Sequence, residues 1–143
     1  MKFFDVVVGY EIALWNAVDE VLAARGMVRL GHLHALRVLD AHEGQARVQE
    51  VSEDVGITVG AASKLVDRLE RDGLAERQPN PANRRSSLVR LTPWGQRSLA
   101  DGMAVAQEAL DQAVGDEDVE QVVAVLERLR ARLASGAVAR SAA

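Results

Sequence analysis

The sequence has no cysteine and few aromatic residues, which make up 3% of its 143 residues. Without cysteine the chain cannot form disulfides, bind a metal through thiolates or sense redox state through a thiol. It also lacks the roughly 20 uninterrupted apolar residues that a membrane helix needs. Its most apolar N-terminal stretch, 3–15, contains Asp5 and Glu11 and shows neither a basic start nor a cleavage-like site. We therefore expect a cytoplasmic protein with no membrane segment.

No aromatic side chain occurs between residues 16 and 93. Proteins that recognise single-stranded or looped RNA usually stack unpaired bases on such side chains. The middle of this chain offers no platform of that kind. If the region binds a nucleic acid, duplex DNA is therefore the favoured ligand.

Charge is unevenly distributed along the chain. The net charge of −4 argues by itself against nucleic-acid binding. Residues 58–90, however, carry seven basic and four acidic side chains, whereas both flanking segments are acidic. A basic middle of this kind indicates a localised phosphate-binding face. A solvated surface with chance clustering explains the pattern equally well, so charge alone does not decide between the two.

Hydrophobic residues make up 48% of the chain, which is enough for the core of a single domain covering residues 1–143. Apolar residues at helical spacing predict four helices in its first half. These are expected at residues 5–25, 30–42, 48–55 and 59–72. A glycine follows each of them, at positions 26, 44, 56 and 73, as is typical of a helix end.

The hydrophobic period changes after position 73. Segments 74–78 and 87–92 are short and suited to strands, and the turn-rich segment 79–83 separates them. This pattern predicts a β-hairpin, or wing. Two long helices follow, the first with Thr92 as its cap and Pro93 at its first position. The second carries a narrow apolar seam of coiled-coil type, and residues 136–143 are expected to form a disordered tail.

The predicted fold is mainly α with a small β-hairpin wing. A winged helix-turn-helix over about 30–92 lies between N- and C-terminal helices at about 1–25 and 93–135. In a helix-turn-helix the first helix contacts the DNA backbone while the second presents its N-terminal turns to the major groove. The apolar N-terminal stretch and the C-terminal seam lack a partner in so small a domain. We therefore expect them to pair across the two-fold axis of a homodimer.

Segment 59–72 fits the role of the recognition helix. Its apolar face, expected in the core, carries Val59, Ala62, Leu65, Val66 and Leu69. The candidate DNA-binding residues at its start and on its other face are Thr58, Gly60, Ala61, Ser63, Lys64 and Arg68. Small side chains at 60 and 61 let the helix approach base edges, while the polar and basic ones can donate hydrogen bonds to bases or phosphates. An ordinary amphipathic surface helix is the alternative interpretation.

The hairpin tip supplies a second set of candidate DNA-binding residues: Asn83, Arg84, Arg85 and Ser86. A narrow minor groove concentrates negative potential, and arginine is the side chain favoured to enter it. Two solvated arginines on a loop would be a reasonable alternative for an isolated pair. That alternative is weaker directly after a helix-turn-helix and its hairpin strand.

Segments 65–77, 79–81, 83–86 and 89–95 carry a resemblance to a known family. They resemble the recognition-helix exit, the wing and the closing LT..G pattern of the MarR family of transcriptional regulators. The resemblance implies an obligate dimer with intertwined N- and C-terminal helices on a pseudo-palindromic duplex site, and we expect a repressor. It also implies release of DNA when a small aromatic or phenolic ligand enters the cleft between the dimer helices and the winged domain.

The chain departs from the family pattern at Asn83. The family usually has an aspartate two positions before the wing arginine, where the acid helps to orient that arginine. An amide can still accept a hydrogen bond from Arg85, but it offers no charge assistance. The wing geometry is therefore less firmly predicted than the fold.

The histidines His32, His34 and His42 raise the question of a metal sensor. Residues two apart do not face each other on a helix, and the sequence shows no evident set of metal ligands. We therefore expect no metal and no cofactor. Tyr10, Trp15 and His34 are instead candidates for a ligand cleft, although a tryptophan at an apolar helical position more often belongs to a core.

Two other classes of protein fit the sequence less well. An enzyme would need a nucleophile with its base, paired acids or a phosphate loop, and the glycines at 56, 60 and 73 mark helix boundaries instead. An adaptor that binds only proteins would lack basic tip residues, yet Lys64, Arg84 and Arg85 are present. Binding of duplex DNA without turnover would separate a regulator from an enzyme.

Overall fold

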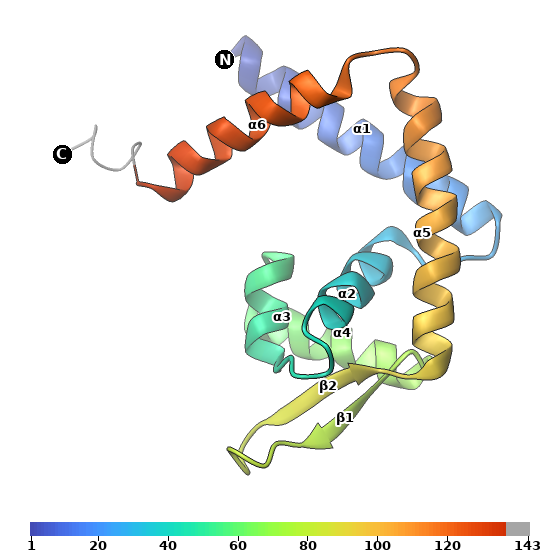
Figure 1. Ribbon diagram of the computed structural model, residues 1–143, viewed down its shortest axis with the longest axis vertical. Coiled ribbons are helices and arrows are strands. Elements are labelled where there is room, and N and C mark those ends of the chain that lie inside the picture. The colour runs from blue at the N-terminus through green and yellow to red at the C-terminus, as the bar shows by residue number, and fades with distance from the viewer. Residues whose placement is uncertain (137–143) are drawn as a thin grey trace. The chain divides into compact units, whose positions relative to one another are not determined.

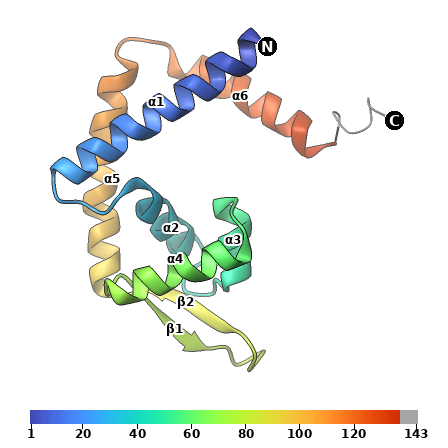
Figure 2. The ribbon, with the colours of Figure 1, turned by 180° about the vertical axis from the view of Figure 1, so that it is seen from behind.

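A computed structural model describes residues 1–136 of the protein, and Figures 1 and 2 show its elements from opposite sides. These are α1 (Lys2–Ala24), α2 (Leu30–Ala41), α3 (Val48–Val55), α4 (Val59–Arg71), β1 (Ala75–Pro79), β2 (Ser87–Leu91), α5 (Pro93–Val114) and α6 (Val119–Ala134). The predicted mainly helical fold with a hairpin wing is confirmed. The chain divides after Leu110 into two compact units. The expected tail lies, apart from Gly136, outside the described residues.

The helix boundaries follow the glycines. Gly56 and Gly73 end α3 and α4 with φ values of 74° and 70°, a left-handed conformation that side chains with a Cβ rarely adopt. Helix α1 begins at Lys2, earlier than predicted, and the other helices of the first half end within a residue of the prediction. None of the helices in residues 1–136 combines the length and apolar character that crossing a membrane requires.

One hydrophobic core lies inside the winged helix-turn-helix, where α3, α4 and the hairpin gather around α2 (Figure 2). Its largest buried side chains are Leu36, Leu39, Val51, Val66, Leu69 and Val89. The prediction that Val59 joins this core is wrong, because its side chain is 47% exposed. Val59 is the first residue of α4, and the buried face of the helix begins nearly a turn later, at Ala62.

The base of the wing is held by two contacts that the sequence did not predict: a bridge from β2 to Ala46 and the close approach of α5 to Leu74 at Gly95. The backbone N–H of Val89 donates a hydrogen bond of 2.7 Å to the carbonyl of Ala46, which adds an isolated bridge to the hairpin. Thr92 caps α5, as predicted, by accepting a hydrogen bond of 3.0 Å from the N–H of Gly95. A Cβ at Gly95 would lie 1.9 Å from the carbonyl oxygen of Leu74. Only glycine therefore allows α5 to approach this backbone so closely.

A second core joins α1, α2 and α5 within residues 1–110. Its buried members are Val18, Leu22, Leu33, Ala106 and Ala109. At its edge the Asp19 carboxylate of α1 accepts a hydrogen bond of 2.7 Å from the backbone N–H of Leu30, the first residue of α2. Asp19 also accepts one of 2.8 Å from Nε of Arg29. A side chain of α1 therefore caps α2 and ties the two helices together.

The hairpin is held against α4 by one arginine. Arg77 of β1 forms an ion pair of 2.8 Å with Asp67 and a second ion pair with Glu70. Glu70 also accepts a hydrogen bond of 2.8 Å from the backbone N–H of Arg77. On the outer side of the hairpin, Arg90 bonds to Glu76 across the two strands at 2.5 Å. Arg77 therefore ties the wing to α4 in addition to the buried core that the two share.

The cap on α2 predicts a stability loss that depends on pH. The hydrogen bond from Arg29 holds the pKa of Asp19 below its usual value. Burial acts in the opposite direction, and the hydrogen bond from the Leu30 N–H lowers the pKa further. The ionised carboxylate therefore stabilises the fold at neutral pH, and this contribution is lost as pH falls through the lowered pKa. We expect Asp19→Ala to lower the free energy of unfolding by about 1 kcal/mol at neutral pH.

Urea unfolding at neutral and acidic pH measures this effect, with Glu20→Ala as a control on the same helix. The difference between the native chain and Asp19→Ala should shrink in acid. An equal difference at both pH values would show that the charge on Asp19 contributes nothing.

The ion pairs of Arg77 predict a second stability difference. Arg77→Ala removes two partly buried ion pairs, and we expect a loss of about 1–2 kcal/mol. Arg90→Ala is the matched control, because its pair with Glu76 is about half exposed on both sides and should contribute under about 1 kcal/mol. Thermal or urea unfolding of both variants measures the difference, and equal losses would refute the role given to Arg77.

Candidate nucleic-acid interface

Helix α4 presents its N-terminal turns to solvent. Thr58 caps the helix as predicted, since its hydroxyl accepts a hydrogen bond of 3.2 Å from the N–H of Ala61. The exposed candidate residues are Thr58, Gly60, Ala61, Lys64 and Arg68, and Ser63 is half-buried. Nothing lies within 4 Å of the position that a Cβ at Gly60 would take. Packing within the described chain therefore does not require this glycine, and the surface above it is open to a partner.

Helix α3 and the turn into α4 are held by side chains. Glu50 accepts a hydrogen bond of 2.8 Å from the backbone N–H of Arg47. Hydrogen bonding to the Arg47 guanidinium lowers the pKa of Glu50 to about 2, so the pair stays ionised at neutral pH. The Ser52 hydroxyl donates a hydrogen bond of 2.8 Å to the carbonyl of Ile57. The first pair caps α3, and the Ser52 bond ties α3 to the turn before α4.

The wing tip is ordered by its own polar side chains. Asn80 accepts a hydrogen bond of 3.0 Å from the N–H of Ala82 and donates one of 2.9 Å to the Ser86 hydroxyl. Asn83 accepts one of 3.0 Å from the backbone N–H of Arg85. The expected acceptor is thus present at Asn83, but its donor is the backbone of Arg85 and not the guanidinium. Asn83 shapes the loop and leaves the Arg85 side chain free to reach outward.

The basic charge of residues 58–90 divides into an internal and an external group. Arg77 pairs with Asp67 and Glu70, and Arg90 pairs with Glu76. These pairs involve three of the four acids in the segment. The remaining basic side chains, which form no ion pair within residues 1–136, are Lys64, Arg68, Arg71, Arg84 and Arg85. Uncompensated positive charge is therefore concentrated on α4 and the wing tip.

The three histidines do not come together. His42 bonds through Nε2 to Asp54 at 2.7 Å, which links the end of α2 to α3. In the part of the chain that the structure describes, no group of three or more His, Asp or Glu side chains is placed to hold a metal ion.

A mostly apolar cavity of 240 Å³ lies among α1, α2 and α5. Its lining is Glu11, Leu14, Trp15, Val18, Leu30, Leu33, His34, Arg37, Met103, Ala106, Gln107 and Leu110. Of the ligand-cleft candidates, the structure brings Trp15 and His34 to this cavity. Tyr10 is not part of the lining, and 54% of it is exposed.

Sequence reasoning missed Arg37, which also lines this cavity. The signal that could have found it is its helical spacing. Residues 30, 33, 34 and 37 share one face of α2, as 103, 106, 107 and 110 share one face of α5. Recognising that these two stripes face each other requires knowledge of the tertiary structure.

Comparison with known proteins supports the family resemblance. The pattern that defines the MarR family matches residues 25–86. The multiple antibiotic resistance protein MarR of Salmonella typhimurium is 35% identical over 85 residues, which are 56% of each chain. A mutant MarR from E. coli, solved in complex with operator DNA, is 20% identical with a TM-score of 0.81, over 93% of this chain and 94% of that one. CouR of Rhodococcus jostii RHA1, solved bound to p-coumaroyl-CoA, is 24% identical with a TM-score of 0.76, over 93% of this chain and 90% of CouR.

The two kinds of comparison carry different weight. The match to the Salmonella protein extends over little more than half of its length, 56%. At identities under 25%, the two solved structures show a shared fold, the winged helix with its flanking helices. The family match covers α2, α3, α4, β1 and the wing tip and ends before β2. Over residues 25–86 the chain therefore matches the MarR family.

Proposed function

We propose that the protein is a transcriptional regulator that binds duplex DNA through α4 and the wing. The observation that carries the proposal is the placement of the unpaired basic side chains. All five basic residues of 58–90 that have no internal partner lie on α4 or at the wing tip. In a chain of overall negative charge, this grouping of the unpaired basic side chains of 58–90 fits a protein that meets phosphates through α4 and the wing.

Each candidate residue has a role in this proposal. Gly60 and Ala61 let the first turn of α4 approach base edges in the major groove. Lys64 donates to bases or phosphates together with Ser63, and Arg68 contacts the backbone of the DNA. Thr58 holds the first turn through its cap.

At the wing, Arg85 enters the minor groove and Arg84 contacts phosphates. Asn83 and Ser86 order the loop from which these arginines extend. The shared fold with a MarR structure solved on operator DNA supports this use of the two elements.

We further propose that the protein acts as a homodimer on a pseudo-palindromic site. The N-terminal half of α1 exposes Phe3, Phe4, Val6 and Val7, and separately α6 exposes Val122, Val123, Leu126 and Leu133. Each apolar surface needs cover, which a second copy of the chain supplies. In this proposal residues 30–92 form the DNA-binding part, while 1–25 and 93–135 form the dimerisation helices. Half-sites then lie about 34–36 Å apart on one face of the DNA.

The cavity among α1, α2 and α5 is the proposed site of a small aromatic or phenolic effector that releases a repressor from DNA. Trp15 offers a ring for stacking, and His34 and Arg37 offer hydrogen bonds at the rim. A ligand seated there contacts α1, α5 and the first half of α2 at once. It can therefore bias the position of the winged part relative to α1. The ligand-bound fold relative supports an effector of this kind.

The DNA face predicts the effects of two substitutions. We expect Arg85→Ala to weaken operator binding by about 1–3 kcal/mol per half-site if the side chain enters the groove. Lys64→Ala should reduce the slope of log affinity against log salt by about one unit per protomer if its contact is to phosphate. Gel shifts on the upstream intergenic DNA of its own gene, at several salt concentrations, measure both effects.

Arg97→Ala is the matched control, because Arg97 lies on α5 and stacks on Trp94 at 5.6 Å, away from the proposed face. It should leave operator affinity unchanged. If Lys64→Ala and Arg85→Ala also bind like the native chain, another face or no face of the protein binds DNA.

The exposed apolar surfaces predict the oligomeric state. Light scattering at micromolar concentration should give the mass of a dimer. Leu126→Asp should shift the protein toward the monomer, because it places a charge on the apolar face of α6, while Glu127→Ala should not. A native chain that is monomeric and still binds its operator would exclude the proposed assembly.

A further inference from the structure

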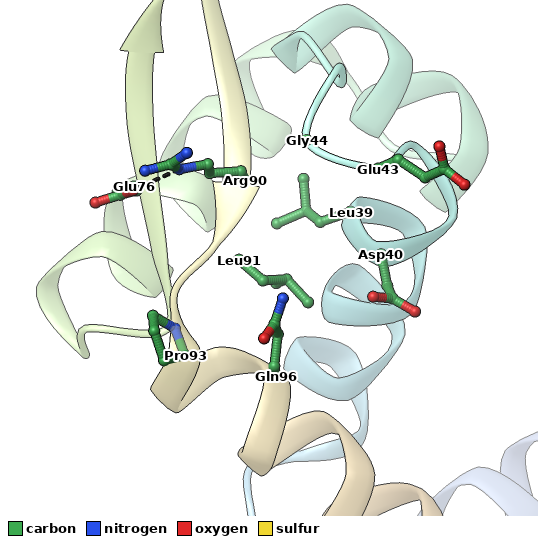
Figure 3. A pocket seen from close by; sticks show the side chains of 9 residues that line it. All are labelled: Leu39, Asp40, Glu43, Gly44, Glu76, Arg90, Leu91, Pro93 and Gln96. Atoms are coloured by element: carbon green, nitrogen blue, oxygen red, sulfur yellow. Dashed lines mark hydrogen bonds and ion pairs between the residues drawn. The ribbon is translucent and has the colours of Figure 1, made fainter.

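Three cavities follow one another along the line where α2 faces α5. The cavity described above shares Arg37 and Met103 with a second one of 440 Å³. The second shares Asp40 and Gln96 with a third one of 330 Å³ at the base of the wing (Figure 3). Each neighbouring pair has two lining residues in common, one on α2 and one on α5, so the three cavities adjoin in a row between the two helices. We call this row the α2–α5 groove.

The groove is far longer than a single aromatic ring. Its α5 wall runs from Gln96 to Leu110, which at 1.5 Å per helical residue is about 21 Å. Along α2, Leu30, His34, Arg37 and Asp40 follow at intervals of three or four residues and so share one face. The two walls run antiparallel, because the start of α2 faces the end of this α5 stretch. A one-ring ligand at Trp15 would leave two of the three cavities empty.

The chemical character of the groove changes along its length. At the α1 end the lining is mostly apolar and includes Trp15. At the wing end, Figure 3 shows Leu39, Leu91 and Pro93 along the pocket between α2 and the strands. Three carboxyl groups also line this end, from Asp40, Glu43 and Glu76.

The wing end carries uncompensated negative charge. Arg90, its one basic residue, is bonded to Glu76 at 2.5 Å (Figure 3). Within residues 1–136, the side chains of Asp40 and Glu43 make no hydrogen bond or ion pair. Both side chains are exposed. This end of the groove therefore attracts a cation and repels an anion.

We propose that the α2–α5 groove binds an elongated molecule with an aromatic end and an ammonium end, the aromatic amide of an alkyl diamine. The ring lies against Trp15, the amide carbonyl accepts a hydrogen bond from Arg37, and the methylene chain follows Leu91 and Pro93. The ammonium group pairs with Asp40 and Glu43. The proposal rests on the proposed regulator function only in naming the effector of the same cavity.

The groove disfavours the ligand class seen in a fold relative. CouR is bound to p-coumaroyl-CoA, whose tail carries several phosphate charges. If a tail of that kind were seated in this groove, it would lie beside Asp40 and Glu43 and be repelled. An ammonium tail would instead reach the cavity formed partly by Glu76 and Arg90 of the wing strands. The bound ligand would therefore contact the base of the wing, whose tip we propose enters the minor groove.

Three probes with the same aromatic head test the proposal: N-(p-coumaroyl)putrescine, p-coumaric acid and p-coumaroyl-CoA. Each is titrated calorimetrically into the full chain without DNA. In Trp94→Phe the fluorescence of Trp15, then the sole tryptophan, reports contact with the ring. We expect the putrescine amide to bind about tenfold more tightly than the free acid, as two partly exposed ion pairs would give. The CoA thioester should bind most weakly.

Paired variants separate charge from shape. The double variant Asp40→Asn with Glu43→Gln should bind the putrescine amide no more tightly than the free acid. The difference in affinity between the amide and the CoA thioester should also become smaller. Asp101→Asn, a carboxylate of α5 outside the groove lining, is the matched control and should change neither. Equal affinities for the three probes, or an amide advantage that survives the double substitution, would overturn the proposal. Binding of none of the probes would also overturn it, while gel shifts without ligand judge the regulator function separately.

Discussion

Helix α2 has to satisfy two hydrophobic cores at once, and the arrangement of residues 1–110 depends on this constraint. Leu36 and Leu39 point into the core of the winged helix-turn-helix, whereas Leu33 belongs to the core with α1 and α5. A short helix buried on two sides cannot rotate without exposing one of these faces to water. Its starting point is fixed as well, because Asp19 of α1 bonds to its first N–H. The core that carries α4 and the wing, the proposed DNA-binding elements, and the cavity among α1, α2 and α5 therefore use different faces of α2.

Much of the fold could be predicted because helix period and glycine position are local properties of a sequence. The spacing of apolar residues placed α2, α3 and α4 nearly to the residue, and Thr58 and Thr92 could be identified as caps from the chain immediately after them. The prediction that Val59 is buried was wrong because periodicity gives the direction of a side chain and not the extent of the surface that covers it. The bridge from Ala46 to Val89 could not be predicted, because pairing through a single residue leaves no periodic pattern in the sequence.

The candidate site was predictable in composition but not in detail. Residue types and order identified α4 and the wing tip as basic elements. The partner of a charged side chain, however, is decided by residues brought near it in three dimensions. Arg77 and Arg84 have the same charge and lie in the same hairpin, yet Arg77 pairs with Asp67 and Glu70 while Arg84 is exposed without an ion pair in the described chain. The net charge of the chain is a poor guide for the same reason, because acids of α4 and β1 neutralise the internal arginines and leave the outer ones unopposed.

The contact at Gly95 has a mechanical consequence. A flexible side chain between two elements acts as a spring, since it can change rotamer and absorb a displacement. At Gly95 no side chain intervenes, and a Cβ there would come within 1.9 Å of the carbonyl oxygen of Leu74. The backbone of α5 therefore lies directly against the backbone of the turn before β1. A displacement of α5 toward this turn would meet backbone directly, with no side chain at Gly95 to absorb it before the root of the wing.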